Sequence, residues 1–347
     1  MQKFVNFQKP IRIFSHAAAG GSEERKGPLG ASFDFCDESD LFGAKTWELA
    51  EGELSRIALS LALKKARISH EDIDILLAGD LQNQCVASYS APTAFGIPYL
   101  GLYGACSTSA EGLYLAASLL DGENALRRAA VVTTSHFCAA ERQFRLPIEY
   151  GGQRPPTAQW TATAGGAFLL TSDEESEATV RITGGMAGVP IDGGISDASN
   201  MGAAMAPAAA HTILSYFDLT GDTPDQFDAI VTGDLGFEGS EILTYLLREN
   251  GLSLADLHRD CGKLLYNPEV QDVHSGGSGC GCSASVLSAH FLPLLECGLF
   301  KRILFLATGA LMSPSSLLQG GSIIGVAPLV VIESTLKEPK SKGNQST

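Results

Sequence analysis

Basic residues are scarce in this sequence, and so are long apolar runs. Its 347 residues include 24 Lys and Arg against 39 Asp and Glu, which gives a formal net charge of −15 and a pI near 4.8. Because affinity for a phosphate backbone comes from cationic side chains, this balance argues against nucleic acid as a partner. The longest apolar stretches, within 285–295 and 303–312, are too short to span a bilayer, which takes about 20 residues.

The sequence also lacks a recognisable signal peptide. Lys3, Lys9, Pro10 and Arg12 interrupt the segment where the apolar core of a signal would lie. We therefore expect a soluble cytoplasmic protein, whose eight cysteines would be mostly free thiols rather than a disulfide framework. The last residues, 337–347, are polar without an apolar period, and we expect a disordered tail there.

An internal repeat is the strongest pattern in the chain. The segment "HEDIDILLAGDL" ends at Leu81, and "PDQFDAIVTGDL" ends at Leu235. Further along, residues 104–136 and 279–311 both read as a small-residue turn with cysteine, an apolar helix, a basic pair and a buried strand. In this second pair of segments we align Cys106 with Cys282. The repeat predicts an N-terminal half over residues 1–175 and a C-terminal half over residues 176–336.

Each half alternates helical and strand patterns. Residues 46–66 are amphipathic with a helical period, whereas 73–79 is apolar without alternation, as in a parallel strand that is covered on both faces. The helix that follows Cys106 is apolar nearly all round and should be buried. Two such halves predict an α/β fold with buried helices between two parallel-rich sheets, a five-layered αβαβα sandwich.

Cys106 lies in "GACSTS", at the expected start of the buried helix. Unpaired N–H groups and the helix dipole favour an anion there, so that a thiolate would be stabilised and the pKa of the thiol lowered. A ligand carboxylate would be favoured in the same way. The plainer alternative is a small cysteine that only packs where helix and sheet meet.

Several motifs resemble known proteins. The two halves, the cysteine turn, "TATAGGAFLL" (161–170) and "GGSIIGVAPLVVIE" (320–333) resemble the thiolase and ketoacyl-synthase superfamily. More narrowly, "KGPLGASFD", "AGDLQNQ", "EYGGQRPPTA", "GAAMAPAAA" and "ATGALMSP" are similar to the stage V sporulation protein AD family, over about residues 11–333. That resemblance implies a thiolase-like protein of spore formers that binds dipicolinic acid and supports its movement into the spore.

The residues that acyl transfer needs are missing from the two turns that would carry them. The synthase branch of the superfamily uses a base and an orienting side chain, His with Asn or His, besides its cysteine. Here "VTGDLG" supplies Asp234, and "GSGCGCSAS" supplies Cys280 and Cys282. We therefore expect a non-catalytic binding protein without a cofactor. The alternative is an acyltransferase that uses Cys106 with His136 or His274 as base, and a third possibility is an assembly component with a vestigial pocket.

Dipicolinate is a rigid dicarboxylate, and each carboxylate suits the planar guanidinium of arginine. Arg142, Arg145 and Arg154 lie close together in an otherwise acidic chain, and we expect at least one of them in the site. The plainer alternative pairs them with Glu141 and Glu149.

The remaining candidates follow predicted strands. His136 ends the strand after the Cys106 helix, where ligand sites of parallel sheets form, although it could also only bond nearby backbone. Asp234 could face the ligand or cap its turn. Zinc is disfavoured because Cys280 and Cys282 have Cys-x-Cys spacing with no second pair. The expected ligand-binding residues are thus Cys106, His136, Arg142, Arg145, Asp234 and Cys282, with no metal site.

The resemblance also implies partners and a place in the cell. Dipicolinate would bind alone or as its calcium chelate, and the ligand would pass to membrane proteins of the same spore uptake system. By analogy with the superfamily we expect a homodimer. The protein would lie in the cytoplasm or forespore, peripheral to the spore inner membrane.

Overall fold

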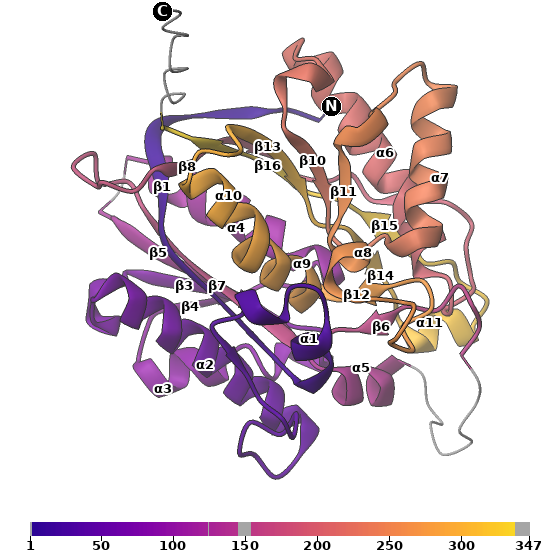
Figure 1. Cartoon of the computed structure of the whole chain (residues 1–347), viewed down its shortest axis with the longest axis horizontal. Coiled ribbons are helices and arrows are strands. Elements are labelled where there is room, and N and C mark those ends of the chain that lie inside the picture. Colours follow the sequence, from indigo (N-terminus) through magenta and orange to yellow (C-terminus); the bar gives the residue numbers. More distant parts are fainter. Residues whose placement is uncertain (1, 124, 145–153, 337–347) are drawn as a thin grey trace, which may run out of the picture.

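A computed structural model describes residues 2–123, 125–144 and 154–336 (Figure 1). Its main sheet has eleven strands, with β2 (Phe35–Cys36) attached to the side of β1. The other strands follow one another in the order β11 (His258–Asp260), β10 (Ala229–Thr232), β13 (Arg302–Leu306), β16 (Leu329–Ser334), β8 (Val180–Met186), β1 (Val5–Gly20), β7 (Ala164–Thr171), β5 (Arg128–Ser135), β3 (Ile75–Gly79) and β4 (Tyr99–Gly101).

The two halves of this sheet share one strand order and one set of strand directions. In the first half β3 is parallel to β4 and β5, while β7 is antiparallel to both β5 and β1. In the second half β10 is parallel to β11 and β13, while β16 is antiparallel to both β13 and β8. The repeat seen in the sequence thus extends to the topology, and the chain passes from β7 to β8 near residue 175.

The halves join in one hydrogen-bonded sheet, where the sequence predicted two. The reason is the length of β1, which has 16 residues. Its beginning pairs with β8 between Val5 and Ile13, and its end pairs with β7 between Arg12 and Gly20. One strand therefore belongs to both ladders.

Three groups of buried apolar residues hold the helices on this sheet. Helix α2 (Trp47–Ala66) and helix α3 (Ser90–Phe95) pack on the first half through residues such as Leu54, Leu59 and Ala91. Helix α4 (Thr108–Asp121), helix α9 (Cys280–Val286) and helix α10 (Leu292–Glu296) share a central group with both halves. Helix α6 (Met201–Thr220) and helix α7 (Gly236–Glu249) pack on the second half. Figure 1 shows α4, α9 and α10 between the other two groups.

The position and the two ends of helix α2 follow from its local sequence. Its amphipathic pattern predicted a helix over 46–66, and Thr46 caps it by accepting a hydrogen bond from the N–H of Leu49. The helix ends where Arg67 takes a left-handed conformation with φ 56°. Its buried residues lie mainly on the face toward the sheet.

Short elements complete the described chain. No helix within these described ranges is long and apolar enough to cross a membrane. The short helices are α1 (Ser22–Lys26), α5 (Phe137–Phe144), α8 (Cys261–Leu265) and α11 (Pro314–Leu318), and a π-helical turn (Leu287–Phe291) joins α9 to α10. The short strands are β6 (Trp160–Thr161), β9 (Ile191–Asp192), β12 (Gly277–Ser278), β14 (Gly309–Leu311) and β15 (Ile324–Val326).

Candidate functional site

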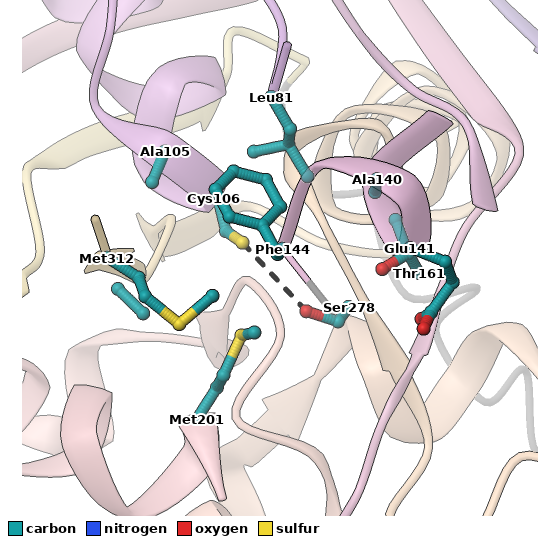
Figure 2. A pocket seen from close by; sticks show the side chains of 11 residues that line it. Leu81, Ala105, Cys106, Ala140, Glu141, Phe144, Thr161, Met201, Ser278 and Met312 are labelled. Carbon is teal, nitrogen blue, oxygen red and sulfur yellow. Dashed lines mark hydrogen bonds between the residues drawn. The ribbon is translucent and has the colours of Figure 1, made fainter. Parts of the chain in front are cut away.

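A cavity lies over the thiol of Cys106 (Figure 2). It measures about 400 Å³ with its mouth included, and both halves of the chain line it. Leu81 and Phe144 come from the first half, and Met201 and Met312 come from the second. The walls are mostly apolar, and they come so close together that the space between them holds little more than a water molecule.

Cys106 reaches this cavity from a single turn of 3-10 helix, Ala105–Ser107, directly before α4. Ala105 takes a left-handed conformation with φ 50°, which is uncommon for a residue other than glycine. The Cys106 side chain is almost completely buried, and its Sγ lies 3.9 Å from Oγ of Ser278. Strand β12 thus presents a hydroxyl to the thiol.

Asp234 stands behind Ser278, at the end of β10. The Ser278 hydroxyl donates a hydrogen bond to Asp234 Oδ2 (3.0 Å), as does the N–H of Gly279 (2.7 Å). Thr308 Oγ1 donates to the other carboxylate oxygen (2.8 Å). Gly279 can hold this position because it has no side chain to oppose its φ of 104°. Cys106, Ser278 and Asp234 therefore form a buried chain of polar groups.

Burial raises the pKa of Asp234 to about 7, although its hydrogen bonds from Gly279 and Thr308 oppose the rise. Burial, together with the negative charge of Asp234, raises the pKa of the Cys106 thiol well above its usual range. The expectation of a lowered thiol pKa is therefore wrong. The helix dipole acts near the start of α4, but loss of water and a neighbouring carboxylate outweigh it at the Cys106 sulfur.

The structure places His136 outside the cavity lining. Its Nε2 donates a hydrogen bond to the backbone carbonyl of Asp40 (2.8 Å), and its ring lies 5.4 Å from that of Trp47. The residue is fully buried, and burial lowers its pKa. His274 bonds the Pro155 carbonyl and Asp272 instead. Neither histidine lines the cavity as a base for Cys106 would.

Arg142 and Arg154 also point away from the cavity. Arg142 lies on α5 next to the cavity residue Glu141, but its guanidinium forms an exposed ion pair with Glu48 (2.8 Å). Arg154 pairs with Asp272 (2.9 Å) and lies 5.0 Å from the ring centre of Trp160. Arg145 falls outside the described residues. Arg142 and Arg154 are therefore not brought to Cys106, and the side chains that α5 turns toward the cavity are Ala140, Glu141 and Phe144.

Cys282 belongs to the central core rather than to the cavity. Cys280 is the cysteine grouped with Cys106, together with Leu81, Ala105 and Ala140. The thiol of Cys280 donates to the carbonyl of Thr134 (3.0 Å). The repeat is therefore in a different register from the one expected at this turn, with Cys280 as the counterpart of Cys106.

A signal for this register was present in the sequence. The basic pairs Arg127-Arg128 and Lys301-Arg302 begin the equivalent strands β5 and β13, and their spacing matches Cys106 with Cys280. Sequence reasoning also missed Ser278 and Thr161, the two hydroxyl side chains of the lining. Ser278 lies in a glycine-rich segment, and its residue type and position in the sequence do not predict that it lies next to the Cys106 thiol.

The described residues contain no group of three or more His, Cys, Asp and Glu side chains that could hold a metal ion.

Solved structures of condensing enzymes have the same fold. The cerulenin-bound OleA of Xanthomonas campestris matches with a TM-score of 0.59 at 16% identity, over 94% of this chain and 100% of that one. AbyA1, a tetronic acid condensing enzyme, matches with a TM-score of 0.57 at 16% identity, over 93% and 100%. The chain thus has the mixed α/β fold of thiolase-like condensing enzymes.

The sequence places the chain within that class more narrowly. Residues 1–333 match the family described as stage V sporulation protein AD. The Bacillus subtilis (strain 168) protein of that name is 43% identical over 327 residues, which cover 94% of this chain and 95% of the relative. The chain belongs to the stage V sporulation protein AD family.

Proposed function

We propose that the chain is a non-catalytic binding protein of spore formation that holds dipicolinate in the cavity over Cys106. It would support movement of this ligand into the developing spore, handing it to membrane proteins of the same uptake system. The observation that supports the proposal is that the polar groups next to the Cys106 thiol are Ser278 and, behind it, Asp234. The thiol in the cavity has a raised pKa, and the described lining contains no histidine beside it.

The hydroxyl groups of the lining are the donors for such a ligand. Thr161 can donate to a carboxylate, and Ser278 can do so once protonation of Asp234 releases the Ser278 hydroxyl proton from that side chain. The apolar walls from Leu81, Met201 and Met312 can cover an aromatic ring. The described lining contains no lysine or arginine. Asp234 has a pKa of about 7, so a negative ligand nearby favours its protonated form. Binding would therefore be accompanied by uptake of a proton.

Calorimetric titration of the purified protein with dipicolinate tests the proposal. Wild type should bind saturably, Met201→Trp should fill the cavity and abolish binding, and Ser278→Ala should weaken it. Leu219→Trp is the matched control, because Leu219 is an exposed residue at the other end of α6. Arg142→Ala should bind like wild type because Arg142 pairs with Glu48. Absence of binding by the wild type, or normal binding by Met201→Trp, contradicts the proposal.

A second candidate function is acyl transfer on Cys106, and the Cys106–Ser278–Asp234 chain is the feature that favours it. Asp234 could accept the thiol proton through the Ser278 hydroxyl while the sulfur attacks a thioester and the donor thiol leaves with a proton. Incubation with acyl-coenzyme A and intact-mass analysis would detect an acyl group on wild type and not on Cys106→Ala. An unmodified wild-type protein excludes this function for the acyl groups tried.

We also propose a homodimer formed along β4. This strand lies at the end of the sheet order, and Val86, Tyr89, Leu100 and Tyr103 near it are large and exposed. Leu100→Lys should convert a dimer to a monomer in sedimentation analysis, whereas Leu318→Lys, at another exposed leucine, should leave it a dimer. A wild-type monomer contradicts this proposal.

A further inference from the structure

A second and wider cavity adjoins the cavity over Cys106. It measures about 770 Å³ with its open mouth included. Leu81, Phe144 and Met312 line both cavities, so these three side chains form the partition between them. A direct route from this outer cavity to the thiol therefore passes between them.

The outer cavity is lined by neutral amides. Gln82, Asn83 and Gln84 follow β3, and Gln143 comes from α5. Each carboxamide offers both N–H donors and a carbonyl acceptor. The described lining holds no acidic or basic side chain other than the Cys85 thiol and the Tyr103 phenol. Burial raises the pKa of both, that of Tyr103 to about 12, so both are neutral near pH 7.

One of these amides has a buried acceptor without a partner. Gln82 is 4% exposed, and its Nε2 donates to Oε2 of Glu51 (2.7 Å). Its Oε1 has no hydrogen-bond partner in the structure. Because a buried carbonyl is normally hydrogen-bonded, this unpartnered acceptor next to the outer cavity is a position where a bound water would be stabilised.

Phe144 is the partition residue that can move most easily. It is the last residue of α5 and is half-buried, and it packs against the buried group that contains Leu81, Cys106 and Ala140 (Figure 2). Leu81 and Met312, in contrast, are almost completely buried. The inner cavity is too narrow for an aromatic ring as it stands, so a ligand of that size needs one wall to shift.

We infer that the outer cavity is an entry chamber for the ligand and that Phe144 is the gate between this chamber and Cys106. The inference rests on the proposed function, since it describes how dipicolinate would reach the inner cavity. In the chamber, Asn83, Gln84 and Gln143 donate N–H groups to the carboxylates. Rotation of the Phe144 ring then admits the pyridine ring to the apolar inner cavity.

Binding kinetics of dipicolinate on the immobilised full chain test the gate. Phe144→Ala should raise the association and dissociation rate constants together, each by about fivefold or more, and Phe144→Trp should lower both. Phe95→Ala is the matched control, because Phe95 also ends a short helix, is half-buried and lines neither cavity. Its rate constants should equal those of wild type.

The chamber is tested by Gln143→Leu and Gln82→Met. Both should slow association by about threefold or more, while Asn250→Leu, which removes an exposed amide remote from both linings, should not. Gln143 is half-exposed, so its variant should fold even if Gln82→Met does not.

If the association rate constant is unchanged in both Phe144 variants, or in Gln143→Leu, the inference is overturned. If the wild type still binds dipicolinate in that case, the proposed function stands. A wild type that binds no dipicolinate overturns both.

Discussion

The Oγ atoms of Ser109 and Ser283 lie 2.7 Å apart, joined by a hydrogen bond between α4 and α9. Both side chains are fully buried. They occupy equivalent places in the two halves, with the same spacing that relates Arg128 to Arg302. The two copies of the repeat therefore contact each other at equivalent residues. The same spacing aligns Cys106 with Cys280.

The first prediction concerns this hydrogen bond. Ser109→Ala and Ser283→Ala should each lower the free energy of unfolding by about 1 kcal/mol, and the double variant should lose less than the sum. Denaturant unfolding of the four proteins gives the coupling energy. Ser118→Ala, whose hydroxyl bonds only the carbonyl of Tyr114 in its own helix, is the control and should show no coupling to Ser283. Strict additivity of Ser109→Ala and Ser283→Ala would show that the two hydroxyls do not stabilise each other.

The second prediction concerns pH. The pKa of Asp234 is raised from 3.8 to about 7 in the folded protein, so folding favours its protonated form. Its contribution to stability is complete below about pH 4 and is lost as the pH rises through 7. Asn has the shape of the protonated side chain. Wild type should therefore lose stability relative to Asp234→Asn, by about 4 kcal/mol between pH 4 and 8.

Chemical unfolding of both proteins at several pH values measures this difference. Glu24 and Asp260 also have raised pKa values, of about 7 and about 6, but both remain in the variant and cancel in the comparison. A stability difference that does not change with pH would mean that Asp234 is ionised in the folded protein.

The third prediction concerns thiol reactivity. Cys106 is buried and has a raised pKa, whereas Cys297 is exposed. Iodoacetamide should label Cys106 about 100-fold more slowly than Cys297 in the native protein, because the thiolate is the reacting form. Asp234→Asn should speed the labelling of Cys106, since it removes a negative charge that raises the pKa. Peptide mapping by mass spectrometry gives both rates, with Cys297 as the internal control. Equal rates in wild type would instead indicate an activated nucleophile.

The fourth prediction concerns the contact between β7 and α9. A Cβ atom at Gly166 would lie 2.6 Å from the backbone oxygen of Ala284. Gly166→Ala should therefore push the helix from the sheet and cost about 2 kcal/mol or more. Gly193→Ala is the control, because the nearest atom to its Cβ is 3.3 Å away, in Pro207. Equal melting temperatures for the two variants would contradict this account.

The sequence determined the local elements of this protein. The periodicity of residues 46–66 predicts α2, and the unbroken apolar segment 73–79 predicts a covered strand where β3 is found. These predictions succeed because helix and strand periods depend on which face of the segment is buried. The turn after β3 is also local, because Asp80 accepts hydrogen bonds from the backbone of Gln82 and Ser88, two and eight residues away.

Only the tertiary structure decided the chemistry of the site. The pKa of Cys106 depends on Asp234, 128 residues further along the chain, and on the water that both halves exclude. The direction of Arg142 depends on Glu48, and the thiol's neighbour Ser278 comes from the other half. Periodicity carries no information on such contacts. They follow from how the two halves pack, so the sequence could identify the cysteine turn but not the charges and hydroxyls around it.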